Sequence, residues 1–220
     1  MATILCLETA TTNCSVTLSV NGSVIAFRED NSKSYSHAER LHVFINEVLQ
    51  EAKLAKDQLD AICVSKGPGS YTGLRIGVSA AKGLCFALDV PLISIATLSA
   101  LASQVTAADA LYIVPMLDAR RMEVYSAVYN SDKEEIRETQ AQILEETSFS
   151  TFLDEGKVLF IGNGVEKFQE ICKHPNALFM PGALPSAVQQ AKLSQAKFDR
   201  QEFEDVAYFE PYYLKDFKVG

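Results

Sequence analysis

The stretch SKGPGSYTGLRIGVSAAKGL at residues 65–84 decides the fold, because it leads from a buried strand into a long helix through a glycine-rich loop. The loop glycines are Gly67, Gly69 and Gly73. Backbone N–H groups in such a loop can face a phosphate. Neither sharp phosphate fingerprint is complete, however. No Lys-Ser or Lys-Thr pair follows the second glycine, and Thr72 occupies the last glycine position of the dinucleotide pattern.

The small residues of this stretch admit three interpretations. One face of the expected helix carries Gly73, Gly77, Ala80 and Ala81 and is nearly bare of side chains. That face could pack closely within the chain, accept a helix of a partner, or belong to a vestigial phosphate site together with the loop. Pro68 removes one N–H group from the loop, which favours the first two interpretations.

The first half of the chain predicts three strands, a helix, a strand and a helix, with a further strand and short helix after them. Asn21-Gly22 lies between two β-rich runs, so the first three strands should form an antiparallel meander. Apolar residues recur at helical spacing over residues 36–53, where Ser36 and Glu39 offer a capping box. The strand DAICVS, the glycine loop, a helix over residues 72–88 and the strand VPLISIA follow.

The same order begins again near residue 110. Three strand-like runs, a short helix, the strand KVLFIGNG and the helix VEKFQEIC succeed one another, and residues 186–198 predict a last helix. We therefore expect an α/β fold of two lobes, each on a β-β-β-α-β-α plan. The N-terminal lobe should span residues 1–105, and the C-terminal lobe, with the closing helix and tail, residues 106–220. The polar segment 103–109 is the expected seam.

Composition limits the function classes. The 220 residues are 48% hydrophobic, enough to bury a substantial core. The net charge of −8, without a run of Lys or Arg, indicates that the chain does not hold a nucleic acid by itself. The five cysteines form no C-x-x-C pair and predict free core residues. We expect a cytoplasmic protein, since no signal-peptide pattern or membrane-spanning apolar run is present.

Two turns carry candidate site residues. Glu8 ends the first strand just before Thr11 and Thr12, where a nucleotide-hydrolysing two-lobed fold would hold a metal-handling acid and a phosphate hairpin. A plain hairpin turn explains the same hydroxyls and is the interpretation we favour. In the second lobe, Arg120 and Arg121 follow a strand end. They could bind an anion or acidic groups of a partner, or pair with neighbouring carboxylates.

Catalytic residues and metal ligands are not expected in this chain. His37 and His42 would lie about 140° apart around a helix and cannot converge on one ion. A G-x-S-x-G elbow is absent from the sequence, and Ser65 has no identifiable base.

Four segments resemble the TsaB (YeaZ) family of bacteria, namely GPGSYTGLRIGVSAAKGL, LDARRMEVYSAVY, ETATTNCSVTL and the tail PYYLK. The resemblance covers both lobes and most of the chain. It implies the two-lobed fold of actin-like, sugar-kinase and Hsp70-related proteins, which is ribonuclease H-like. It also implies a non-catalytic role in forming N6-threonylcarbamoyladenosine at position 37 of tRNAs that read ANN codons.

The resemblance further implies partners. In the family, the related subunit TsaD transfers the threonylcarbamoyl group, and the ATPase TsaE joins the complex. A second copy of the chain would replace TsaD when TsaD is absent, and tRNA would be reached only through the complex. The chain itself should require no cofactor, with ATP and Mg²⁺ entering through the complex. TsaD-like proteins carry a His-x-x-x-His metal motif, whereas here Leu41 stands four residues after His37.

A partner surface is expected on the helix at residues 36–53 and on the helix after Thr72. Its predicted members are an apolar ridge and the small residues described above: Leu41, Phe44, Ile45, Val48, Gly73, Gly77, Ala80 and Ala81. On this hypothesis, Phe44→Asp abolishes complex formation and leaves a folded chain.

Three other functions remain open. An ATP-dependent small-molecule kinase or hydrolase of the same fold would bind Mg-ATP tightly. A dinucleotide-binding enzyme would use Asp89 for the ribose, although its glycine loop would normally follow the first strand. A glycoprotease-like peptidase rests on an older family label, and the sequence contains no protease constellation.

Overall fold

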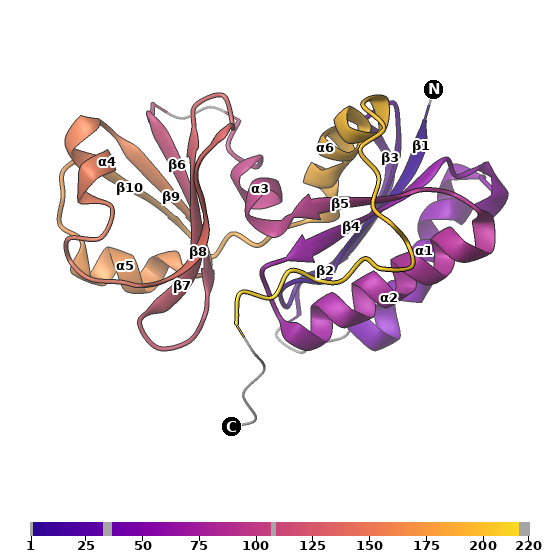
Figure 1. The fold of residues 1–220 in the computed structure, drawn as a ribbon, viewed down its shortest axis with the longest axis horizontal. Coiled ribbons are helices and arrows are strands. Elements are labelled where there is room, and N and C mark those ends of the chain that lie inside the picture. Colours follow the sequence, from indigo (N-terminus) through magenta and orange to yellow (C-terminus); the bar gives the residue numbers. More distant parts are fainter. Residues whose placement is uncertain (1, 33–36, 107–108, 216–220) are drawn as a thin grey trace. The chain divides into compact units, whose positions relative to one another are not determined.

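The computed structural model describes residues 2–32, 37–106 and 109–215, and the chain divides into two compact units. The first unit combines Met1–Ala100 with Pro185–Gly220, and the second is Leu101–Leu184. Each unit is built around one five-stranded sheet (Figure 1). No helix within the described ranges is long and apolar enough to cross a membrane.

The sheet of the first unit has the order β3-β2-β1-β4-β5. Its strands are β1 (Thr3–Glu8), β2 (Cys14–Val20), β3 (Ser23–Asp30), β4 (Ala61–Gly67) and β5 (Leu92–Ala96). The first three form the predicted antiparallel meander, and β4 lies parallel to both β1 and β5. Asn21 and Gly22 turn the β2–β3 hairpin with φ of 50° and 73°, the left-handed values that a two-residue turn requires.

Helices cover both faces of this sheet (Figure 1). On one face, α1 (His37–Ala52) and α2 (Tyr71–Leu88) pack over a core that includes Leu5 and Leu7. On the other face, α6 (Ala187–Asp199) packs over a core that includes Ile4 and Cys6. Alternate residues of β1 therefore meet opposite layers, which explains why TILCLE is apolar almost throughout. A 3₁₀ turn (Lys56–Gln58) precedes β4, and α3 (Thr97–Ala102) follows β5.

The second unit repeats this arrangement with the sheet order β10-β9-β6-β7-β8. Its elements are β6 (Tyr112–Asp118), β7 (Glu123–Asn130), β8 (Glu135–Ile143), α4 (Ser150–Glu155), β9 (Val158–Gly162), α5 (Val165–Ile171) and β10 (Ala177–Pro181). Strands β6 to β10 occupy the places of β1 to β5, so the duplicated plan is confirmed. Strand β10 was not predicted, because the short run ALFMP follows Pro175 closely and itself ends in Pro181.

The chain end differs from the expected lobe boundaries. Residues 106–220 were assigned together to the second lobe, yet α6 packs on β1, β2 and β5 of the first unit. Its buried residues are Ala187, Gln190, Ala191 and Ser194, which face the sheet surface that α1 and α2 leave uncovered. Ser36 lies outside the described residues, and α1 is described from His37 onward.

Residues 200–215, which we call the C-terminal strap, also run over the first unit (Figure 1). The Glu204 N–H donates a hydrogen bond to the Leu92 carbonyl at 2.8 Å, beside β5. The Tyr212 N–H donates to the Lys66 carbonyl at 2.7 Å, at the end of β4. The strap therefore reaches the glycine loop.

Candidate functional site

Glu8 is the centre of a buried polar cluster at the end of β1. Its side chain is 0% exposed. One carboxyl oxygen accepts a hydrogen bond from the Ala10 N–H at 2.7 Å. The other accepts from Ser65 Oγ and, at 3.1 Å, from Gln190 Nε2. The cluster therefore ties β1, β4 and α6 together through a single carboxyl group.

Burial raises the pKa of Glu8 above its ordinary value of 4.5, because the charged form loses its hydration. Hydrogen bonds from Ser65, from the Ala10 N–H and from Gln190 oppose this effect but do not outweigh it. The neutral acid thus persists to a higher pH than in water. The hydrogen bonds from three separate segments make Glu8 a structural link within the first unit.

The raised pKa of Glu8 predicts how stability depends on pH. Between the ordinary pKa near 4.5 and the higher folded pKa, the unfolded chain releases a proton that the folded chain keeps. The stabilisation that Glu8 contributes to the folded chain is therefore full below this pH window and is lost as pH rises through it. We expect the unfolding free energy of the wild type, relative to Glu8→Gln, to fall with pH by about 1.4 kcal/mol for each unit of pKa elevation. Urea unfolding at a series of pH values measures the difference, and a flat profile would contradict a raised pKa of Glu8.

Glycines bring the loop and α2 directly onto the turn between β1 and β2. A Cβ atom at Gly73 would overlap the Thr9 carbonyl oxygen, and one at Gly77 would overlap Thr9 Oγ1. The same Thr9 hydroxyl donates to the Gly73 carbonyl at 2.7 Å. At Gly69, a Cβ would overlap the Ala10 carbonyl oxygen. Close packing within the chain therefore explains glycine at these three positions.

The C-terminal strap contacts the glycine loop on the side opposite the β1–β2 turn. Gly67 has a φ of +112°, and a Cβ there would lie 2.6 Å from the Tyr212 carbonyl oxygen. From α2, Lys82 Nζ donates to the carbonyls of Ala207 and Phe209 at 3.1 and 2.9 Å. The loop is thus held between the β1–β2 turn and the strap.

The hydroxyl residues of the β1–β2 turn serve the turn itself. Thr11 is buried, and its Oγ1 accepts a hydrogen bond from the Asn13 N–H at 3.3 Å. The Thr11 carbonyl lies 2.7 Å from Nε2 of His37, at the start of α1. Of the residues predicted for a vestigial phosphate site, Glu8, Thr11, Gly67 and Gly69 make close contacts within the chain, and Thr12 is half-buried.

The apolar ridge predicted as a partner surface on α1 is part of the first unit's own core. The exposed fractions of Leu41, Phe44, Ile45 and Val48 lie between 0% and 7%. An amphipathic helix turns its apolar stripe toward the sheet it covers, and these four side chains fill that layer. Their assignment to a partner interface is corrected accordingly.

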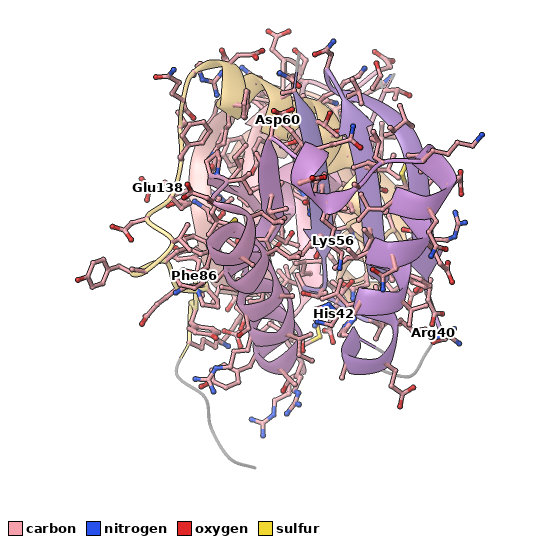
Figure 2. The ribbon with its side chains drawn as sticks, turned by 90° about the vertical axis from the view of Figure 1, so that its right-hand side faces the viewer. Arg40, His42, Lys56, Asp60, Phe86 and Glu138 are labelled. Atoms are coloured by element: carbon pink, nitrogen blue, oxygen red, sulfur yellow. The ribbon has the colours of Figure 1, made fainter. Side chains whose placement is uncertain are left out.

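An open surface remains on the outward side of α2. A groove of about 360 Å³ between α1 and α2 is lined by His42, Ile76, Ser79, Ala80, Gly83 and Leu84. Figure 2 looks onto these two helices and shows His42 between them. Of the four small residues predicted for the interface, Ala80 lines the groove, whereas Gly73, Gly77 and Ala81 are buried.

Gly83 and Phe86 belong to this open face and were missed from the sequence. A Cβ atom at Gly83 would meet nothing within 4 Å, so no contact inside the chain requires glycine there. Phe86 is 86% exposed, and Figure 2 shows it on α2 beside the C-terminal strap. The spacing of Ile76, Ser79, Gly83 and Phe86 follows one face of a helix and could have identified them. Around the helix axis, this face lies beside the face of small residues that was predicted as the partner surface.

In the second unit, the hairpin between β6 and β7 presents Arg120 and Arg121 at its tip. Both residues have left-handed backbone conformations, with φ of 69° and 50°, and both are exposed. The carboxylate of Asp118, one of the partners considered for them, binds Lys167 Nζ from α5 instead. Among the described residues, neither guanidinium group has a hydrogen-bond or ion-pair partner.

Two sheets of identical order, each with the same succession of strands and helices, define a two-lobed α/β protein of the actin-like, sugar-kinase and Hsp70-related type. A solved structure of YeaZ from Pseudomonas aeruginosa matches with a TM-score of 0.81 and 27% identity, covering 97% of this chain and 100% of the other. A second structure from that organism, of a protein similar to peptidase YeaZ, has a TM-score of 0.85 and 28% identity, covering 98% and 100%.

Sequence comparison defines the family. The model described as "TsaD: tRNA N6-adenosine threonylcarbamoyltransferase" matches residues 31–218. The tRNA threonylcarbamoyladenosine biosynthesis protein TsaB of Bacillus subtilis is 32% identical over 97% of this chain and 94% of its own length. The Escherichia coli protein of the same name is 29% identical over the same shares. The chain therefore belongs to the family of that model and, within it, to the TsaB (YeaZ) group.

Proposed function

We propose that this chain is a non-catalytic subunit in the formation of N6-threonylcarbamoyladenosine at position 37 of tRNAs that read ANN codons. Its relatives in Bacillus subtilis and Escherichia coli are named for the biosynthesis of this nucleoside. The chain acts by binding a catalytic subunit of the TsaD type and, with it, the ATPase TsaE. Alone, it pairs with a second copy of itself through the same surface.

The observation that carries this proposal is the close packing of the chain at the turn between β1 and β2. In a nucleotide-hydrolysing protein of this fold, the turn after the first strand needs free space for a phosphate. Here Gly73 lies against the Thr9 carbonyl, and Glu8 is engaged by Ser65 and Gln190. ATP and Mg²⁺ then enter the reaction through the complex, and this chain supplies no cofactor site of its own.

The docking surface is the outward face of α2. Glycine in a helix interior costs about 1 kcal/mol relative to alanine, and no contact within the chain offsets that cost at Gly83. The close approach of another helix would offset it. Phe86 supplies an exposed aromatic anchor three residues further along, beside a groove large enough for an apolar side chain. A TsaD-type subunit of the same fold offers a related pair of helices as the partner.

Complementation of depleted cells tests this function. We expect cells depleted of the chain to lose threonylcarbamoyladenosine from their tRNA and the wild-type gene to restore it. The variant Phe86→Asp should restore less than about a tenth of it, because a charge at the centre of an interface typically costs several kcal/mol. Mass spectrometry of tRNA nucleosides provides the measurement, and co-purification shows whether the TsaD subunit still binds.

Phe27→Asp is the matched control, because Phe27 is a 49% exposed aromatic on β3. Its neighbour Arg28 binds Glu47 and Glu51 of α1, so Phe27 faces the opposite side of the sheet. This variant should restore the nucleoside fully. Normal nucleoside levels after depletion would refute the proposal, and tight Mg-ATP binding in a thermal-shift titration would then support an ATP-dependent kinase or hydrolase.

A further inference from the structure

The tip of the β6–β7 hairpin has residue types that the fold does not explain. Left-handed backbone conformations at two consecutive turn positions are typical of Asn-Gly, as at Asn21-Gly22 in the first unit. Arg120 and Arg121 adopt them here although a residue with a Cβ is disfavoured in this region. Among the described residues, neither arginine side chain stabilises the fold through a hydrogen bond or ion pair.

An ion pair and several hydrogen bonds nevertheless anchor the hairpin to the rest of the second unit. Lys167 Nζ binds the Asp118 carboxylate and donates to the carbonyls of Arg121 and Glu123, each at 2.7 Å. The Asp118 N–H donates to Asn163 Oδ1 at 2.9 Å. The Ala119 N–H and the Glu123 carbonyl close the ladder at 3.0 Å. Figure 1 shows this hairpin at the end of the second sheet.

Lys167 also affects the balance of charges at the β6–β7 hairpin. It neutralises Asp118, so this carboxylate does not compensate the charge of the two guanidinium groups at the tip. The exposed Glu145 and Glu146 follow Leu144, whose N–H bonds the Met122 carbonyl at 2.7 Å. These two acids follow the strand that pairs with the hairpin, so the exposed basic residues of this region are limited to the tip.

We propose that Arg120 and Arg121 bind one or two backbone phosphates of the tRNA, within the complex that this chain forms. This inference rests on the proposed function. An arginine side chain presents a planar fork of donors that matches a phosphate group. Two adjacent arginines at a hydrogen-bonded hairpin tip can bind one or two neighbouring phosphates of a nucleic-acid backbone. Because the net charge of the chain is −8, RNA binding by this chain is limited to the small area around Arg120 and Arg121.

Salt dependence of tRNA binding by the complex of this chain with its TsaD-type and TsaE-type partners tests the proposal. Labelled tRNA is titrated with the complex at a series of KCl concentrations. For Arg120→Gln with Arg121→Gln, we expect the slope of log affinity against log salt to become shallower by roughly 0.7–0.9 for each phosphate that the variant no longer binds. At low salt, the affinity should fall at least about tenfold.

The matched control is Lys192→Gln with Arg200→Gln, which removes the same charge from exposed positions in the first unit. Arg200 is already paired with Glu202, and loss of such an exposed pair has little effect on stability. This control should leave slope and affinity unchanged. Equal weakening by both double variants, or an unchanged slope for the tip variant, would overturn the assignment of phosphate binding to the tip.

Two further outcomes separate this inference from the proposed function. If the tip variant fails to assemble with the partner subunits while the wild type assembles, the arginines contact protein and the inference is wrong. If the wild-type complex binds no tRNA, the proposed function fails and the inference fails with it. Size-exclusion chromatography of each complex before titration distinguishes these cases.

Discussion

Phe44→Asp is expected to unfold the first unit and not merely to release a partner. Phe44 is 7% exposed and belongs to the core between α1 and the sheet. Truncating a buried phenylalanine costs about 3–5 kcal/mol, and an unpaired carboxylate in the same place adds a desolvation penalty. Since a typical domain is stable by about 5–15 kcal/mol, the variant should lose most of its stability. Near-UV circular dichroism and a thermal melt would show this loss.

The same substitution one residue earlier provides the control. Val43 is 45% exposed on α1, so Val43→Asp removes little buried surface. Its free energy of unfolding should change by less than about 1 kcal/mol. If Phe44→Asp melted like Val43→Asp and lost only its partner, the apolar ridge on α1 would be an interface and the core assignment would be wrong.

Gly73→Ala and Gly83→Ala should change stability in opposite directions although they lie on one helix. At Gly73, the new methyl group would overlap the Thr9 carbonyl oxygen. That oxygen cannot move easily, because the adjacent Ala10 carbonyl accepts the Ser70 N–H at 2.7 Å. We expect Gly73→Ala to lower the free energy of unfolding by about 2 kcal/mol. Urea unfolding of the isolated chain measures it.

Gly83→Ala is the matched control, since a Cβ at Gly83 meets no atom within 4 Å. Alanine favours a helix over glycine by about 1 kcal/mol, so this variant should be more stable by that amount. The measurement requires low protein concentration, because self-association would add to apparent stability. If both variants were stabilised equally, the close approach of α2 to the β1–β2 turn would be refuted. In the complex, Gly83→Ala should instead weaken partner binding.

Local patterns predicted the strands and helices well because each depends on neighbours in sequence. Asn21-Gly22 gave the hairpin, and the apolar spacing of residues 36–53 gave α1. The segments GPG and GNG, at residues 67–69 and 162–164, end β4 and β9 in the same way and reflect the duplication. Strand β10 was overlooked, since a five-residue run that ends in a proline carries too little pattern.

The orientation of each helix face could not be obtained from the sequence. Spacing places Gly73, Gly77 and Ala81 together, yet it does not say whether they meet a sheet or a partner. The same ambiguity applies to Phe44, whose apolar ridge would suit either role. Only the position of α2 against Thr9 separates the buried stripe from the open face around Gly83.

The sequence by itself determined the two-lobed plan, the incomplete phosphate loop and the resemblance to the TsaB family, because these rest on residue types and their order. Tertiary structure decided the rest. It placed α6 and the C-terminal strap on the first unit, closed the loop between Thr9 and Tyr212, and engaged Glu8 with Gln190. These contacts join segments more than a hundred residues apart in places. Their free energy depends on which surfaces meet, and local sequence pattern does not encode that choice.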